Sequence, residues 1–432
     1  IFDRIGNTVQ WSPPVATHDR PFCRAGGLQG VVHQQVEVLQ EAFGLSDSAR
    51  GMRNLLHRIG VSHHKATGFF WKADPDKPLE ITAEGDEGRI TDVTATDAMG
   101  RYVAGELTAD GSRWHSTAPL AAGADYTVRV STEDDEGSPG RKVLNFATDK
   151  AAKKKQLKVT LGPVAGKYGV GQPVTAKLSA KVKGKEARGI VERALKVRSQ
   201  PATEGAWHWV DSQTLHYRPK DYWPTDATVD VTSNLEGIKV TDKLWGAGTK
   251  PLRFTTGDKI VAVTDAGSHW MTVYRNGEEI NSMPVTTGKP GYATRNGIKV
   301  VLGKEYAVRM TSASIGASDF YDKMVYYATR VTDSGEYVHA APWSVGSQGN
   351  ANTSHGCTGM STGNAAWFYE TVRQGDIVKV VNSYGADMDP FGNGFGDWNV
   401  SWKKWVEGSA LLGGAKKGPK PADVARLRPQ SV

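Results

Sequence analysis

The residues best suited to chemistry in this chain are Cys357, in Ser354-His355-Gly356-Cys357, and His339, which lies eighteen positions upstream. Two cysteines in 432 residues cannot build a disulfide framework, so we expect a chemical role for Cys357. A thiol near its ordinary pKa of about 8.5 is mostly protonated at neutral pH. A neighbouring imidazole can accept that proton and leave a thiolate. The pattern predicts a nucleophile, Cys357, with His339 as its general base.

This motif resembles the signature of the L,D-transpeptidases, the YkuD-type cysteine enzymes of bacterial cell walls. In that signature a histidine and a short spacer precede Ser/Thr-His-Gly-Cys, and a hydrophobic residue and an asparagine follow it. Residues 340–353 form the matching spacer here. Thr358 and Gly359 depart from the final pair. The substrate-holding role of the family's asparagine therefore falls to position 359 itself, to Asn364 or to a backbone amide.

The resemblance implies a role for each residue near the cysteine. The backbone carbonyl of Ala340 orients the imidazole of His339. Tyr321 matches the family's lid tyrosine, whose hydroxyl shares an oxyanion cradle with the Cys357 amide. An inert buried thiol and an ordinary lid aromatic are the plain alternatives for Cys357 and Tyr321.

The remaining members of the predicted site bind substrate and shape its pocket. His355 shapes the pocket rather than acting as the base, and Ser354 bonds within its own loop. Gly356 permits close backbone approach, and Trp343 lines the acyl pocket. The full substrate-binding set is His355, Ser354, Gly356, Trp343, Gly359 and Asn364.

The implied reaction joins two peptidoglycan stem peptides. The cysteine attacks the carbonyl between an L-centre and a D-centre of a tetrapeptide stem, releases D-Ala and leaves a thioester. An amine of a neighbouring stem then resolves the thioester into a 3→3 cross-link. The resemblance implies no cofactor and no metal, and it implies carbapenem β-lactams as acylating inhibitors.

Three other functions compete with this one. An L,D-carboxypeptidase would use water as the acceptor with the same catalytic residues. A non-catalytic cell-wall-binding protein is motivated by Gly359 in place of the family's asparagine. A papain-like protease is the third alternative. In that class the cysteine precedes the histidine in the sequence, which is the reverse of the order here.

The charge and hydropathy of the chain limit the classes of partner that it could bind. The chain has no apolar run of about eighteen residues, so we expect no membrane span. A net charge of +7 favours anionic partners. The basic residues are scattered apart from residues 153–155 and the tail from Lys416, which argues against nucleic acid. The resemblance implies an extracytoplasmic place in the cell envelope and leaves open membrane anchoring through a segment that precedes Ile1.

The elements that position the motif are mainly strands. Alternating apolar and polar residues at 79–82, 126–130, 157–160 and 229–232, with frequent turn clusters, predict two small sandwiches that resemble immunoglobulin-like domains. The aromatic residues at 207–223 fill a core or, alternatively, bind sugar. In the catalytic domain we expect one helix, at 364–374, a hairpin turn at Asn276-Gly277, and strands at 260–265, 271–274, 279–281, 299–302 and 377–381.

These elements predict a mainly β fold, with two immunoglobulin-like sandwich domains before a YkuD-type catalytic domain that carries a helix and a small C-terminal subdomain. The expected divisions are an N-terminal segment of uncertain order at 1–66, immunoglobulin-like domains at 67–150 and 157–256, a catalytic domain at 257–383, a C-terminal subdomain at 384–412 and a disordered tail at 413–432.

The first 66 residues differ from the rest. They hold five of the eleven histidines, which suggests a metal site, but no carboxylate or cysteine cluster lies at ligand spacing. An accessory segment with short helices at 31–43 and 49–59 is therefore the simpler interpretation. Cys23 follows Pro21-Phe22, a context that does not support lipidation.

Overall fold

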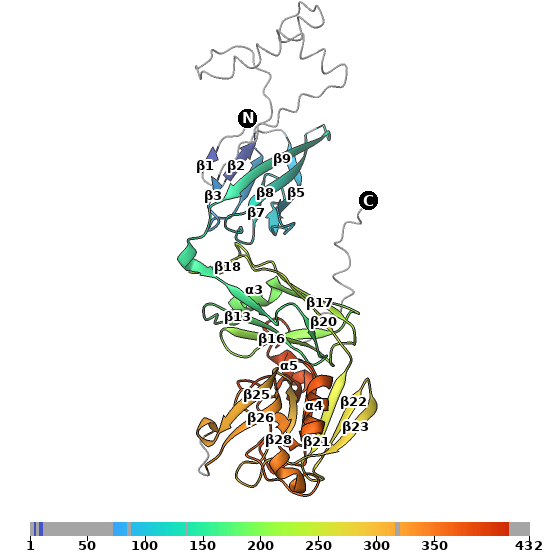
Figure 1. Cartoon of the computed structure of the whole chain (residues 1–432). Coiled ribbons are helices and arrows are strands. Elements are labelled where there is room, and N and C mark those ends of the chain that lie inside the picture. The colour runs from blue at the N-terminus through green and yellow to red at the C-terminus, as the bar shows by residue number, and fades with distance from the viewer. Residues whose placement is uncertain are drawn as a thin grey trace, which may run out of the picture. The chain divides into compact units, whose positions relative to one another are not determined.

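The computed structural model describes residues 4–5, 8–11, 72–83, 88–134, 136–315 and 320–413. The chain divides into two compact units, Ile1–Lys150 and Ala151–Val432, and each is described on its own. The fold is mainly β, as the sequence predicts (Figure 1). Within the described ranges, every helix is too short or too polar to cross a membrane.

The first unit consists of two facing sheets. One has the order β1 (Arg4–Ile5), β2 (Thr8–Trp11), β4 (Glu80–Ala83), β7 (Arg113–Ser116), β6 (Gly105–Leu107), and the other β3 (Lys72–Ala73), β9 (Pro139–Thr148), β8 (Asp125–Glu133), β5 (Arg89–Asp97). Trp114, Tyr126 and Phe146 are buried, and the last two rings stack with centroids 5.1 Å apart. The alternating pattern at 79–82 and 126–130 thus becomes two core-facing strands.

The N-terminal segment contributes to this unit. Strand β2 pairs in parallel with β4, so part of the segment of uncertain order belongs to the first sheet. Residues 12–66 lie outside the described residues, and with them the expected helices, the five histidines and Cys23. The tail at 414–432 does so as well.

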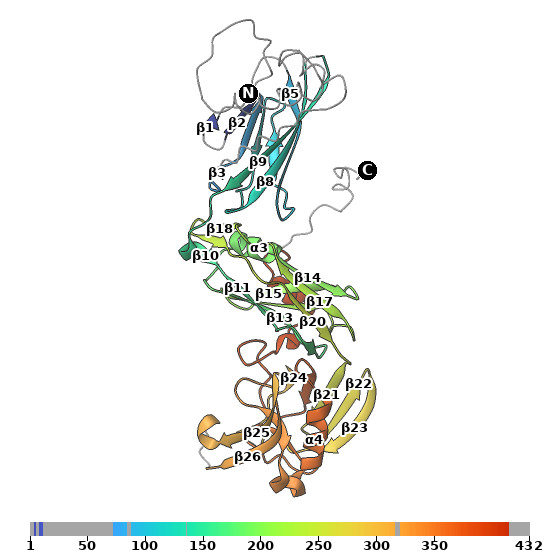
Figure 2. The ribbon, with the colours of Figure 1, turned by 45° about the horizontal axis from the view of Figure 1, so that its top comes forward.

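The second unit begins with another sandwich (Figure 2). Its sheets are β11 (Val159–Gly162), β13 (Val174–Leu178), β16 (Thr214–Pro219), β15 (Gly205–Trp209) and β12 (Lys167–Tyr168), β20 (Leu252–Thr256), β17 (Thr228–Ser233), β14 (Leu195–Gln200), beside a small sheet of β10 (Gln156–Leu157), β19 (Leu244–Gly246), β18 (Lys239–Thr241). Trp207, Trp209 and Trp223 are at most 6% exposed, so these aromatics form core rather than a sugar-binding surface.

Two short helical segments of this region were not expected from the sequence. The linker holds a 3₁₀ turn, η1 (Lys153–Lys155), and the sandwich carries α3 (Lys185–Ala194). The residue before α3 is Gly184, which has φ +84° and no side chain that could cap the helix. The usual start signal of a helix is therefore missing from the sequence.

The region predicted to be the catalytic domain has two sheets with a helix between them. The sheets are β23 (Glu278–Pro284), β22 (Trp270–Arg275), β21 (Ile260–Asp265), β29 (Ile377–Val381), β24 (Gly297–Val300) and β25 (Gly303–Thr311), β26 (Asp322–Arg330), β27 (Tyr337–Ala340), β28 (Thr358–Met360). The hairpin turn is present, with Asn276 at φ +54° and Gly277 at φ +96°. The predicted helix is α4 (Thr362–Thr371), which begins at the Ser361 cap and ends three residues earlier than expected.

Helix α4 joins the two sheets through the core. Ala365 and Phe368 are buried in one cluster with Met271 of β22 and Val338 of β27. Since α4 follows β28 directly, this packing fixes the strand that starts after Cys357.

The C-terminal subdomain packs against the second sandwich. It contains η4 (Asp397–Asn399) and α5 (Trp402–Glu407). The fully buried Trp405 donates from Nε1 to the carbonyl of Ala206, at 2.9 Å. The guanidinium of Arg218 lies 4.8 Å and 4.6 Å from the ring centroids of Trp398 and Trp405. The tryptophan-rich segment therefore attaches the catalytic domain to the sandwich before it.

Candidate active site

Two adjacent parallel strands place the histidine beside the cysteine motif. In the β27–β28 ladder His339 lies opposite Gly359, two residues after Cys357. All four residues of β27 are buried, as expected of a strand with neighbours on both sides. Strand pairing therefore brings His339 close to Cys357, although the two residues are eighteen positions apart in the sequence.

The imidazole of His339 is held in one orientation by the backbone. It is 5% exposed, and its Nδ1 lies 2.8 Å from the carbonyl oxygen of Ala340. A carbonyl only accepts, so Nδ1 carries the proton and Nε2 is left as the basic nitrogen. Burial lowers the pKa of His339 below its ordinary value of 6.5, and the bond to Ala340 opposes that shift.

The thiol of Cys357 is protonated in this environment. The side chain is half-buried, and its S–H donates to the carbonyl of Gly335, at 3.6 Å. Burial raises the pKa of the thiol to about 11, whereas the N–H of Tyr337 lowers it. Among the hydrogen bonds of the described residues, none joins Cys357 to His339. Proton transfer between them requires the S–H to turn away from Gly335.

The loop before Cys357 is closed by its own hydrogen bonds. The hydroxyl of Ser354 donates to the carbonyl of Cys357, at 2.6 Å, and accepts from the N–H of Gly356, at 3.1 Å. Gly356 has φ +117°, a conformation that other residues rarely adopt. This explains the serine and the glycine of the motif without any contact to substrate.

A cavity of about 370 Å³ opens onto these groups. Its walls include Cys357, His339, Ser354, His355, Gly359, Tyr321 and Trp343. The rings of Tyr321 and His355 lie 4.7 Å apart between centroids. Trp343 is 49% exposed, and the ammonium of Lys323 lies 4.2 Å from its ring centroid. Lys323, which sequence reasoning missed, gives the cavity wall a cation.

The two residues named for the role of the motif's asparagine, Gly359 and Asn364, lie in different surroundings. Gly359 lines the cavity and exchanges two backbone hydrogen bonds with Thr286, at 2.8 Å and 2.9 Å. A Cβ at this position would lie 2.9 Å from the Cβ of Ala341, so a larger side chain does not fit. Asn364 lies in the first turn of α4 and is not part of the cavity wall.

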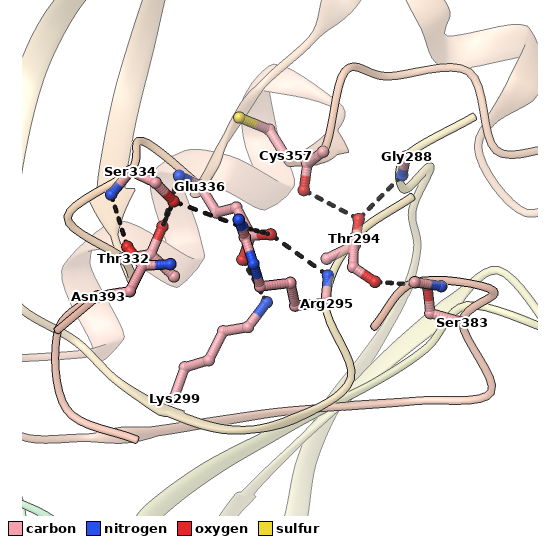
Figure 3. Close-up of polar contacts among 12 residues, drawn as sticks. Gly288, Thr294, Arg295, Lys299, Thr332, Ser334, Glu336, Cys357, Ser383 and Asn393 are labelled. Carbon is pink, nitrogen blue, oxygen red and sulfur yellow. Dashed lines mark hydrogen bonds and ion pairs between the residues drawn. The ribbon is translucent and has the colours of Figure 1, made fainter. Parts of the chain in front are cut away.

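Residues that sequence reasoning missed brace the motif loop from outside. The hydroxyl of Thr294 donates to the carbonyl of Gly356 and accepts from the N–H of Gly288, both at 2.9 Å (Figure 3). Asn352 accepts from the hydroxyl of Thr287, at 2.7 Å. Small hydroxyl residues after a strand carry no sequence signal that separates this role from an ordinary turn.

A buried ion pair next to Cys357 was also missed. Lys299 is 1% exposed and lies 2.5 Å from the carboxylate of Glu336, which is 7% exposed. Charged residues inside apolar strand sequence are the signal that could have revealed it, because they are rarely buried unless paired. Within the described ranges, no three His, Cys, Asp or Glu side chains converge as a metal site would require.

Two family models match parts of this chain. Residues 258–380 match the family model "L,D-transpeptidase catalytic domain" (YkuD), which covers the strands and loop described above. Residues 71–239 match "Bacterial Ig domain", across most of both sandwiches. The predicted mainly β fold with immunoglobulin-like and YkuD-type parts is therefore confirmed.

The chain is similar to named proteins over most of its length. L,D-transpeptidase 2 of Mycobacterium tuberculosis is 37% identical over 78% of this chain and 81% of the relative, and L,D-transpeptidase 5 of the same species is 32% identical over 77% and 73%. A solved structure titled "LD transpeptidase LdtMt1 in complex with imipenem" is 37% identical over 52% of this chain and 99% of that chain, with a TM-score of 0.45. The chain belongs to the L,D-transpeptidase family.

Proposed function

We propose that the protein is a peptidoglycan L,D-transpeptidase that works through a thioester on Cys357 and forms 3→3 cross-links. One observation carries this proposal. Cys357 and His339 line the same cavity, and the imidazole is oriented by the Ala340 carbonyl so that Nε2 is the basic nitrogen. Nucleophile, base and orienting group are the three parts that acyl transfer by a cysteine requires.

The first half-reaction acylates the cysteine. Nε2 of His339 takes the thiol proton, and the sulfur attacks the carbonyl between the L- and D-centres of a tetrapeptide stem. The backbone N–H of Cys357 and the hydroxyl of Tyr321 bind the developing oxyanion. The imidazolium then returns its proton to the leaving D-Ala amine, and the C–N bond breaks as the thioester is completed.

The second half-reaction transfers the acyl group. The side-chain amine of a diamino acid on a neighbouring stem attacks the thioester, and His339 accepts the amine proton. Collapse of the tetrahedral adduct forms the amide cross-link and returns the proton to the sulfur. Lys323 on the cavity wall is placed to attract a carboxylate of the stem peptides.

The size and lining of the cavity suit a peptide rather than a whole protein. Its volume of about 370 Å³ is within the usual range for small-ligand sites. The substrate of this reaction lies in the cell wall, so we propose an extracytoplasmic location. We also propose that carbapenems inhibit the protein by acylating Cys357.

The test is incubation of the protein with a disaccharide–tetrapeptide, followed by mass spectrometry of the products. We expect release of D-Ala and a cross-linked dimer from the wild type and from Cys23→Ser, and neither product from Cys357→Ala. Fragmentation of the dimer identifies the linked residues. Release of D-Ala without a dimer would show a carboxypeptidase instead, and no product from the wild type would contradict both functions.

A further inference from the structure

The ion pair behind the cysteine joins the two sheets of the catalytic domain. Lys299 lies in β24 of one sheet, and Glu336 directly precedes β27 of the other. Arg295 completes the cluster, with its Nη1 2.9 Å from the Glu336 carboxylate. Figure 3 shows the side chains of Lys299, Arg295 and Glu336 gathered together, with Thr294 beside them.

Glu336 lies in the short segment that contacts the thiol and leads into the strand of the base. Its neighbour Gly335 accepts the S–H of Cys357, and the N–H of its other neighbour, Tyr337, also acts on the thiol. His339 follows three residues later, in the strand β27 that begins at Tyr337. A displacement of the Glu336 backbone would therefore move the acceptor of the thiol and the strand of the base together.

The segment is held from several directions. The N–H of Glu336 donates to the hydroxyl of Thr332, at 2.9 Å, and the N–H of Ser334 donates to Asn393, at 2.7 Å (Figure 3). The carboxylate of Glu336 accepts from Lys299, from Arg295 Nη1 and from the Arg295 N–H. These bonds satisfy a buried carboxylate, which would otherwise be costly to keep charged.

We propose that Lys299 and Glu336 are positioning residues of the active site: the pair fixes the Gly335–Tyr337 segment behind the sulfur, and the Lys299 ammonium offsets the field of the Glu336 carboxylate at the thiol. This rests on the proposed role of Cys357 as the nucleophile. The charges act on the sulfur in opposite directions, since Glu336 raises the pKa of the thiol and Lys299 lowers it.

This opposition separates an electrostatic role from a purely structural one. Lys299→Met leaves the Glu336 carboxylate in place beside Arg295, so the thiol becomes harder to ionise. The double variant Lys299→Met/Glu336→Gln removes both charges and with them the excess negative field. A structural role alone predicts that the double variant is no better than the single one.

The experiment measures alkylation of Cys357 by iodoacetamide between about pH 6 and pH 11, by intact mass, in a Cys23→Ser background. We expect the apparent thiol pKa to rise by about half to one pH unit in Lys299→Met, which slows alkylation at pH 8 about three- to tenfold. The double variant should return to within about twofold of the parent rate.

Lys304→Met is the matched control, because Lys304 donates to the carbonyls of Tyr369 and Val372 and not to Glu336. The dependence of its alkylation rate on pH should equal that of the parent protein. An unchanged profile in Lys299→Met, or a double variant as slow as the single one, overturns the proposal. Thermal unfolding of each variant shows whether it is folded. Alkylation does not depend on turnover, so failure of the proposed transpeptidase reaction would appear separately in the product assay.

Discussion

Gly359 stands where the motif that this chain resembles has an asparagine, and its surroundings predict what a side chain there would do. The residue is buried, is bonded on both backbone groups to Thr286, and lies opposite His339 in the β27–β28 ladder. A Cβ would lie 2.9 Å from the Cβ of Ala341 and 3.1 Å from the Cγ2 of Thr286. Both distances are shorter than ordinary carbon–carbon contact.

These two close contacts determine how much a side chain at position 359 would destabilise the protein. Neither neighbour is a flexible chain end, because one is a methyl on the backbone and the other belongs to a β-branched side chain. Gly359→Ala should therefore destabilise the catalytic domain by about 1–3 kcal/mol, the usual cost of overpacking. For a unit of this size that lowers the melting temperature by about 2–10 °C. Gly359→Asn should cost at least as much.

The assay pairs thermal unfolding with the rate of acylation by a carbapenem. Gly363→Ala is the control, because a Cβ at Gly363 meets no atom within 4 Å. This control should match or slightly exceed the wild type in stability, since alanine is the better helix former. Equal stability and equal acylation rates in Gly359→Ala and the wild type would refute the steric account of the missing asparagine.

Three further predictions concern the lid, the base and the domain joint. Tyr321→Phe should lower turnover roughly a hundredfold without the total loss expected of Cys357→Ala, because one oxyanion donor of two remains; an unchanged kcat would exclude the hydroxyl. Because burial lowers the pKa of His339, the neutral base persists below pH 6.5, and acylation should weaken only as the pH falls beneath that value; a decline that begins above it, in a pH–rate profile, would contradict the assignment. Glu192→Gln should lower the free energy of unfolding by about 1–3 kcal/mol, because the carboxylate accepts from Trp209 and from the N–H of Ala410, at 3.2 Å and 2.7 Å; calorimetry that shows no change would disprove this joint.

Several strands of the sheet that contains β21 and β29 could be predicted because their signals are local, whereas β25 to β28 of the other sheet were not predicted. Asn276-Gly277 specifies its own hairpin, and residues 260–265 and 377–381 coincide with β21 and β29. Helix α3 was missed because its start at Gly184 has no capping side chain. The local signal fails where tertiary packing, rather than the helix end, supplies the stability.

The site could be predicted only as far as its motif extends. Cys357 and His339 were found from residue types and spacing. The Lys299–Glu336 pair joins residues 37 positions apart, one in a strand of the first sheet and the other directly before a strand of the second. The sequence also could not place Asn364, which lies in the first turn of α4 and is not among the residues that line the cavity. Such pairings depend on the three-dimensional arrangement of the sheets, which no local pattern encodes.

The central claim, an acylating thiol activated by a backbone-oriented histidine, is tested most directly by intact-protein mass after incubation with a carbapenem. We expect a single adduct on the wild type and on Cys23→Ser, slow formation of the same adduct on His339→Asn, and none on Cys357→Ala. An adduct that survives in Cys357→Ala, or no adduct on the wild type, would contradict the account.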